Sequence, residues 1–247
     1  MGEQARNVIV SGAARGIGRS LSRHFLDKGD RVFLLDIQAD ELQCCVDVHL
    51  KRHAGRAARR ALFFGGRVDV LVNNGGIATP QWRDGKAMED PDTLARVAGR
   101  DEIADSVDGA DAVAADVGST AGPCIIHIGS FRAHQSDANQ GGYASTKAGQ
   151  LGLMHSMAIS LARWGIRVNL VAPGRIKAAH ECRDGDEAGE EEAGWARQVV
   201  GKDVADHPAN RAGRPRDIAQ AVEYLVSAGF VTGEELTVDG GALKMKS

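Results

Sequence analysis

Short apolar runs recur along the chain, and segments with helical spacing separate them. The runs are NVIV at 7–10, RVFLL at 31–35, VDVLV at 68–72, CIIHI at 124–128, IRVNLV at 166–171 and ELTV at 235–238. Runs that are apolar on both sides, with helices between them, are typical of parallel strands covered on both faces. The pattern therefore predicts an α/β fold, a single-domain, Rossmann-like, doubly wound parallel sheet over residues 1–247.

Two of the intervening segments have clear helical periodicity. Ile17, Leu21 and Phe25 recur at four-residue spacing, and Gly29 follows as a stop. Residues 143–164 carry a second stripe, which consists of Ala144, Ala148, Leu151, Ala158 and Ala162. Because residues three or four apart share one face of a helix, both segments are predicted to pack against the sheet.

Two regions depart from this alternation. Residues 39–65 allow two interpretations, of which we favour the first: CCVDV is a short third strand that ends at Asp47. In the second, that strand is missing and one helical stripe contains Leu42, Cys45, Val46, His49 and His53. The segment 94–122 is rich in Ala, Asp and Gly and lacks the apolar face of a buried helix, so we expect it to be irregular.

Composition and charge narrow the class of ligand and the compartment. Lys plus Arg number 30 against 33 acids, a net charge of -3, so no strong field draws the protein to nucleic acid or an anionic membrane. The four cysteines have neither zinc-ligand spacing nor disulfide-scaffold density, and His49 and His53 lack an evident third ligand, so no metal site is expected. Without a run long enough to span a membrane, the chain is expected to be cytoplasmic.

Three glycines follow the first predicted strand. Gly12, Gly16 and Gly18 would let the backbone turn tightly and approach a pyrophosphate, whose charge meets amide N–H groups and a helix N-terminus. Asp36 ends the second predicted strand, where an acid accepts hydrogen bonds from an adenosine ribose and repels a 2′-phosphate. Arg15, inside the turn, is a cation that could reach such a phosphate. Asp36 therefore favours NAD, whereas Arg15 keeps NADP as the less favoured alternative.

A tyrosine and a lysine stand four residues apart in GGYASTKAGQ. Tyr143 and Lys147 would lie on the same side of a helix. A free phenol, with a pKa of about 10, is a poor base at neutral pH, but a nearby ammonium favours the phenolate and makes proton transfer with an alcohol possible. Ser130 follows the strand CIIHI at the edge where such folds bind ligands, and its hydroxyl could hold a substrate oxygen.

These motifs together resemble the short-chain dehydrogenase/reductase family over nearly the whole chain. The matching segments are SGAARGIG at 11–18, Asn73-Asn74-Gly75-Gly76, Ser130 with Tyr143 and Lys147, Pro173-Gly174, and the C-terminal stretch 210–241. The resemblance implies hydride transfer between a nicotinamide ring and a carbonyl or alcohol. By this resemblance, Tyr143 would be the acid/base, Lys147 would stabilise the phenolate and hold the nicotinamide ribose, and Ser130 would orient the substrate oxygen.

The resemblance also implies a set of cofactor contacts. We expect them at Gly12, Arg15, Gly16, Ile17, Gly18, Asp36, Asp47, Asn73, Gly75, Tyr143, Lys147, Pro173, Gly174 and Ile176. Asp47 belongs to this set if it ends a third strand, where it would match an aspartate that contacts adenine. By position, residues 176–208 correspond to the loop that covers the substrate, and their acidic stretch HECRDGDEAGEEE is also typical of a solvated surface.

The chain departs from the family in its fourth helix. The family carries an asparagine there that holds a relay water behind the lysine, and 94–122 contains none. The same helix usually forms a homo-oligomer interface, so oligomerisation stays open. Two functions follow: an oxidoreductase that acts on the alcohol or carbonyl group of a small metabolite, which we favour, or a related nucleotide-binding protein with weak or no redox activity, serving as a sensor, a scaffold or a non-redox catalyst.

Overall fold

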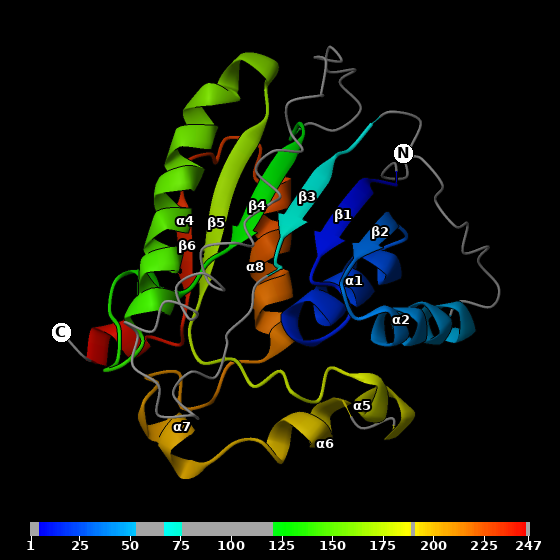
Figure 1. The fold of residues 1–247 in the computed structure, drawn as a ribbon, viewed down its shortest axis with the longest axis vertical. Coiled ribbons are helices and arrows are strands. Elements are labelled where there is room, and N and C mark those ends of the chain that lie inside the picture. The colour runs from blue at the N-terminus through cyan, green and yellow to red at the C-terminus, as the bar shows by residue number, and fades with distance from the viewer. Residues whose placement is uncertain (1–4, 53–66, 76–120, 189–190, 246–247) are drawn as a thin grey trace.

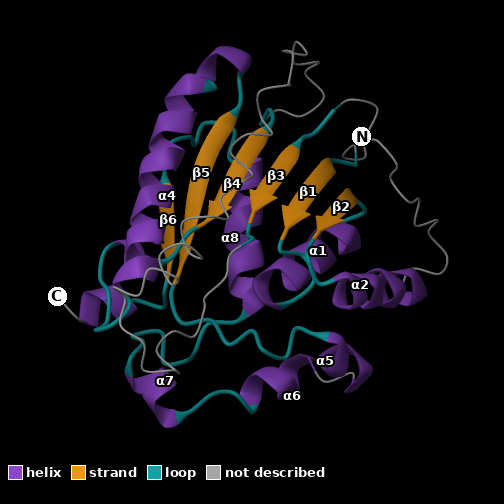
Figure 2. Ribbon diagram, viewed as in Figure 1, coloured by secondary structure: helices purple, strands orange, loops and turns teal. Residues whose placement is uncertain are grey.

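The protein is built on one parallel sheet (Figures 1 and 2). The computed structural model describes residues 5–52, 67–75, 121–188 and 191–245. Six strands lie in the order β2-β1-β3-β4-β5-β6, and every neighbouring pair is parallel. Their bounds are β1 Asn7–Ser11, β2 Arg31–Leu35, β3 Val70–Asn73, β4 Cys124–Ile128, β5 Arg167–Pro173 and β6 Glu235–Val238. The doubly wound α/β prediction is confirmed, and each predicted apolar run contains a strand.

Helices cover both faces of the sheet. Their bounds are α1 Gly16–Asp27, α2 Ala39–Arg52, α4 Gly141–Ser160, α5 Arg183–Ala188, α6 Glu191–Ala196, α7 Gly201–Ala205 and α8 Pro215–Ser227, with single 3-10 turns η3 Phe131–Ala133, η4 Ala162–Trp164 and η5 Ala242–Met245. Helices α1 and α8 pack together on one face, and α4 packs on β5 at the other. Helices α5, α6 and α7 lie beyond the end of the sheet toward which the strand arrows point (Figure 1).

Among the described residues, no helix combines the length and apolarity that a bilayer crossing requires.

The larger core lies between α1, α8 and the sheet. Leu21 and Phe25 of α1 are fully buried, as the four-residue spacing predicts. Ile218 and Val222 of α8 meet them over the strands. Each such side chain contributes about 1.5–3 kcal/mol when it is removed from water. Gly29, with φ of +89°, follows α1 in the left-handed conformation, so the predicted stop is confirmed.

Helix α4 buries a face that differs from the predicted alanine stripe. Leu151 and Ala158 pack toward β5 as expected, whereas Ala148 is exposed. Ala162 lies beyond the helix in η4 and is also exposed. Met154 is fully buried beside Ala158, because turning the larger methionine toward the sheet removes more apolar area from water than turning an alanine.

The favoured third strand at CCVDV is wrong. Residues 39–52 form the single helix α2, so the second interpretation is correct as far as the structure describes this region, and His53 lies outside it. Asp40 and Glu41 favour the helix N-terminus electrostatically, and Cys45 is buried with the three-to-four-residue spacing of a helix. Asp47 is exposed in mid-helix, where it accepts a 2.8 Å hydrogen bond from Gln43. The expected adenine contact of Asp47 therefore loses its structural basis.

The segment 94–122, which the sequence predicts to be irregular, lies outside the described residues except for its last two positions.

Glu223 of α8 binds three basic side chains and joins that helix to α1 and to the residue that precedes β1. Its carboxylate lies 3.0 Å from Arg6, 3.3 Å from His24 and 2.9 Å from Lys28. Burial alone would raise the pKa of Glu223, but the hydrogen bonds from these side chains outweigh burial and lower the pKa well below its ordinary value of 4.5.

Glu223→Gln is expected to lower the free energy of unfolding at pH 7 by about 1–3 kcal/mol, since charged hydrogen bonds are lost. Because the folded-state pKa is depressed, this stabilisation is complete above pH 4.5 and disappears as the pH falls toward the folded-state value. Urea unfolding of both proteins from pH 7 to pH 3 measures the difference, with the exposed Glu187→Gln as control. A difference that stays constant over this range would contradict the assignment.

Candidate active site

The glycine turn between β1 and α1 adopts a conformation that strongly favours glycine. Gly12 and Gly16 have φ of +62° and +59°, in the left-handed region. A Cβ atom on Gly18 would lie 1.9 Å from the carbonyl oxygen of Gly12, and one on Gly12 would lie 3.0 Å from the Cα atom of Gly75. The turn is therefore as tight as the sequence predicts, and it forms a cradle that side chains would fill.

Asp36 lies directly against this turn. One carboxylate oxygen accepts the N–H of Ala14 at 2.9 Å, and the other accepts the N–H of Gln38 at 2.9 Å. The half-buried acid thus joins the end of β2 to the turn, at the position that the sequence predicts. Arg15 precedes α1 as its N-cap residue and is exposed.

The end of β3 closes the turn from the other side. Ser11 Oγ accepts the N–H groups of Asn74 and Gly75 at 3.0 and 2.9 Å. The Asn74 side chain donates to the carbonyl oxygens of Ser11 and Gly12 at 3.1 and 3.0 Å. The prediction named Asn73 and Gly75 but missed the part that Asn74 plays. The repeated asparagine at the end of an apolar strand was the available signal.

Ser130, Tyr143 and Lys147 gather at the end of β4. Lys147 Nζ lies 5.8 Å from the centroid of the Tyr143 ring and donates to the carbonyl oxygen of Ile128 at 3.0 Å and to Gln150 at 3.1 Å. Ser130 stands two residues beyond Ile128, is buried, and accepts the backbone N–H of Arg132 at 3.2 Å. Since η3, which follows Ser130, packs against α4, the tyrosine helix and the serine turn lie side by side.

The segment after β5 lies at the same edge of the sheet. Pro173 ends the strand, and Gly174 donates its N–H to Val238 at 2.9 Å. A Cβ atom on Gly174 would lie 2.6 Å from the Cα atom of Asp239, so this position also requires glycine. Ile176 forms a parallel bridge with Gly213 and packs against the main core.

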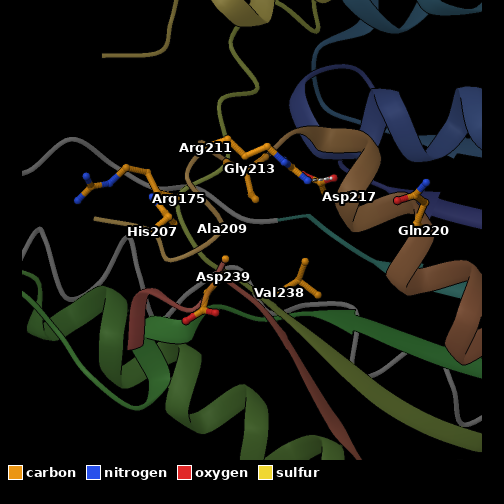
Figure 3. Close-up of a pocket in the computed structure, with 11 residues that line it drawn as sticks. Arg175, His207, Ala209, Arg211, Gly213, Asp217, Gln220, Val238 and Asp239 are labelled. Carbon is orange, nitrogen blue, oxygen red and sulfur yellow. Dashed lines mark hydrogen bonds and ion pairs between the residues drawn. The ribbon is translucent and has the colours of Figure 1, made fainter. Parts of the chain in front are cut away.

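A cavity of about 290 Å³ lies on the α8 side of this segment (Figure 3). Its walls include Ile176, Val238 and Gln220, and they also contain the ion pair of 2.6 Å between Arg211 and Asp217. None of the three candidate catalytic residues lines this cavity. We therefore assign it no part in the chemistry.

The acidic stretch after Ile176 is partly buried, contrary to its interpretation as a solvated surface. Glu181 is 3% exposed, and its carboxylate pairs with Arg23 at 2.8 Å. Asp186 of α5 pairs with Arg19, a fully buried residue of α1 that the sequence reasoning missed. Composition alone could not reveal these ion pairs, because each joins residues far apart in the sequence.

Two of the cysteines are poor candidates for nucleophilic chemistry. Burial raises the pKa of the Cys45 thiol and of the Cys124 thiol to about 11, although nearby arginines oppose the shift. The described residues contain no group of three or more potential metal ligands. The candidate catalytic groups among them are therefore still the hydroxyls of Ser130 and Tyr143 and the ammonium of Lys147.

Comparison with known proteins identifies related oxidoreductases. The family model described as enoyl-(acyl carrier protein) reductase matches residues 12–242. The chain is 31% identical over 256 residues to the 3-oxoacyl-(acyl-carrier-protein) reductase FabG of Vibrio cholerae, with 98% of each chain covered. It is 30% identical over 253 residues to 7alpha-hydroxysteroid dehydrogenase of Escherichia coli, with 96% of this chain and 93% of that protein covered.

Solved structures share the fold. A short-chain dehydrogenase/reductase of Burkholderia thailandensis matches with a TM-score of 0.63 at 26% identity, over 98% of this chain and 94% of that one. An NADPH-bound short-chain oxidoreductase of Pseudomonas aeruginosa matches with a TM-score of 0.73 at 21% identity, over 96% of both chains, and this likeness concerns the fold alone.

The chain belongs to the short-chain dehydrogenase/reductase family. It is an oxidoreductase of the class that uses nicotinamide cofactors, and the alternative of a binding protein without efficient redox chemistry is not favoured.

Proposed function

We propose that the protein interconverts an alcohol and a carbonyl group on a small metabolite, with NAD as the preferred cofactor. The observation that carries this proposal is the placement of the Lys147 ammonium over the Tyr143 ring at the end of β4, on the same sheet edge as the glycine turn. The small net charge of -3 agrees with a small substrate rather than a polyanion.

The glycine turn fits a dinucleotide, because its left-handed glycines leave the backbone bare where a pyrophosphate must approach. When bound, the nicotinamide supplies or accepts the hydride. Gly12, Gly16 and Gly18 would hold the phosphates, and the segment from Pro173 to Ile176 would hold the nicotinamide side. Tyr143 Oη moves a proton to or from the substrate oxygen, Lys147 stabilises the phenolate, and Ser130 Oγ orients that oxygen.

The preference for NAD rests on Asp36. Its carboxylate is fixed at the end of β2 by the N–H of Ala14, where the adenosine ribose of a dinucleotide would lie. A carboxylate accepts hydrogen bonds from the two ribose hydroxyls and repels a 2′-phosphate. An NADPH-bound oxidoreductase shares this fold, so the fold does not itself select NAD.

Asp36→Ser is expected to raise the affinity for NADPH relative to NADH by about tenfold or more, because the repulsion of the 2′-phosphate disappears. Fluorescence titration with each cofactor gives the two dissociation constants. Asp40→Ser, which removes an exposed acid from the first turn of α2, is the matched control and should leave their ratio unchanged. An unaltered ratio in Asp36→Ser would mean that this acid does not face the ribose.

Thermal unfolding tests the proposed function itself without knowledge of the substrate. A cofactor held at about 100 times its dissociation constant adds ~2.7 kcal/mol to the free energy of unfolding. At equal concentrations of the two cofactors, NADH should therefore raise the midpoint more than NADPH, and a panel of secondary alcohols should then give turnover with NAD. If neither cofactor raises the midpoint, the proposal is wrong.

A further inference from the structure

Residues 178–188, which we call the strap, lie across the glycine turn. The carbonyl oxygen of Glu181 accepts the backbone N–H of Gly16 at 2.8 Å. A Cβ atom on Gly16 would lie 3.9 Å from the Cβ atom of Ala178, so this part of the strap is in van der Waals range of the turn. An amide N–H that the turn would offer to a phosphate is therefore already bonded to the strap.

Two arginines of α1 fasten the strap. Arg19 Nε donates to Asp186 Oδ2 at 2.9 Å, and Arg23 donates to Asp186 Oδ1 at 3.0 Å, so the two carboxylate oxygens are bonded to different arginines. Arg19 also donates to the carbonyl oxygen of Ala14, inside the turn, at 2.7 Å. One fully buried guanidinium thus binds the turn and the strap together.

Helix α2 adds a second attachment. The backbone N–H of Arg183 donates to Glu41 Oε2 at 3.1 Å, and the Arg183 side chain donates to the carbonyl oxygen of Asp40 at 2.9 Å. Glu41 also lies 3.4 Å from Arg19. The strap is therefore bonded to the turn, to α1 and to α2, which are the elements around the proposed adenosine end of the site.

We infer that Asp186 is a positioning residue of the nucleotide site, an inference that rests on the function proposed above. Through Arg19 and Arg23 it holds the strap on the turn. A phosphate reaches the N–H of Gly16 only after the carbonyl of Glu181 has moved away. Opening of the strap therefore precedes full seating of the dinucleotide.

Removal of the Asp186 charge should favour the open strap. Arg23 keeps its pair with Glu181 and Arg19 keeps its longer contact with Glu41, but the two buried guanidinium groups lose the carboxylate that they share, so the closed state is weakened. Asp186→Asn keeps the size of the side chain and one carbonyl acceptor, which limits the damage to packing. The exposed Asp184→Asn, in the same helix, is the matched control.

Amide hydrogen exchange of the protein without nucleotide tests the attachment directly. In Asp186→Asn, exchange at Gly16 and over the strap should rise by about tenfold or more, whereas exchange in β5 should stay as in the unmodified protein and in Asp184→Asn. Unchanged exchange at Gly16 would overturn the inference. A proportional rise in β5 as well would also overturn it, because it would show only a general loss of stability.

Stopped-flow binding of NADH, followed by tryptophan fluorescence, tests the role in nucleotide entry. In the unmodified protein the observed rate should level off as the NADH concentration rises, since strap opening becomes limiting. Asp186→Asn should raise that plateau by about the same factor as the exchange at Gly16. A rate that rises linearly in the unmodified protein, with no change in Asp186→Asn, would refute the role in entry.

The exchange and binding experiments together also distinguish a failure of this inference from a failure of the proposed function. If neither NADH nor NADPH binds, the proposed function fails and nucleotide entry fails with it. The exchange measurement still decides whether Asp186 holds the strap on the turn, because it uses no nucleotide. If NADH binds and exchange at Gly16 is unaltered in Asp186→Asn, the proposed function stands and the inference falls.

Discussion

Replacing Tyr143 with Phe is expected to lower kcat by about 10²–10⁴-fold, with a change of less than ~2-fold in the dissociation constant of NADH. The substitution keeps the ring that lies 5.8 Å from Lys147 Nζ and removes the hydroxyl that would transfer the proton. Because the loss falls on the chemical step, single-turnover rates should decrease as much as kcat. Steady-state and single-turnover kinetics, together with a cofactor titration, measure both quantities.

The chain offers a matched control for this substitution. Its second tyrosine, Tyr224, is exposed on α8, away from the end of β4. Tyr224→Phe should leave kcat and cofactor affinity unchanged. Undiminished turnover in Tyr143→Phe would rule out the phenol as the acid/base.

Gly18→Ala is expected to abolish cofactor binding and to lower the free energy of unfolding by roughly 3 kcal/mol or more. The added methyl group would lie 1.9 Å from the carbonyl oxygen of Gly12, so backbone must move, and overpacking of this kind costs about 1–3 kcal/mol in ordinary cores. The displaced turn would also lose its close approach to a pyrophosphate. Urea unfolding and an NADH titration measure the two effects.

Gly152→Ala is the matched control for that substitution. Gly152 is exposed on α4, and beyond the adjacent backbone of its own helix no heavy atom lies within 4 Å of the added Cβ position. Alanine there should leave NADH affinity unchanged and stabilise the helix by up to ~1 kcal/mol. Normal NADH affinity in Gly18→Ala would mean that the turn can relax without losing its site.

The sequence predicts the sheet and the glycine turn well because both depend on local patterns. A buried parallel strand needs a short apolar run, and each of the six runs contains a strand. The glycine turn needs residues without a Cβ atom, and Gly18 has no space for one. Tyr143 and Lys147 face the same side because helical spacing alone places residues four apart on one face.

The errors arise where tertiary contacts choose between local alternatives. CCVDV is compatible with a strand, but Cys45 is buried as part of a helix that contacts α1. On α4, Met154 rather than Ala148 meets the sheet, and the difference in size becomes decisive only once the sheet is present. The buried acid Asp186 could not be recognised, since its arginine partners belong to the first helix.

The link between Arg19 and Asp186 has a consequence for the order of folding. The two residues stand 167 positions apart in the chain. Contacts so distant form late, because the entropy of closing a long loop must be overcome before they contribute. The turn at 11–18 and Asp36 are close neighbours in sequence and can assemble earlier. We therefore expect a refolding chain to pass through a stage in which the N–H of Gly16 is not bonded to Glu181, so that a dinucleotide present at that stage meets no competitor for this N–H.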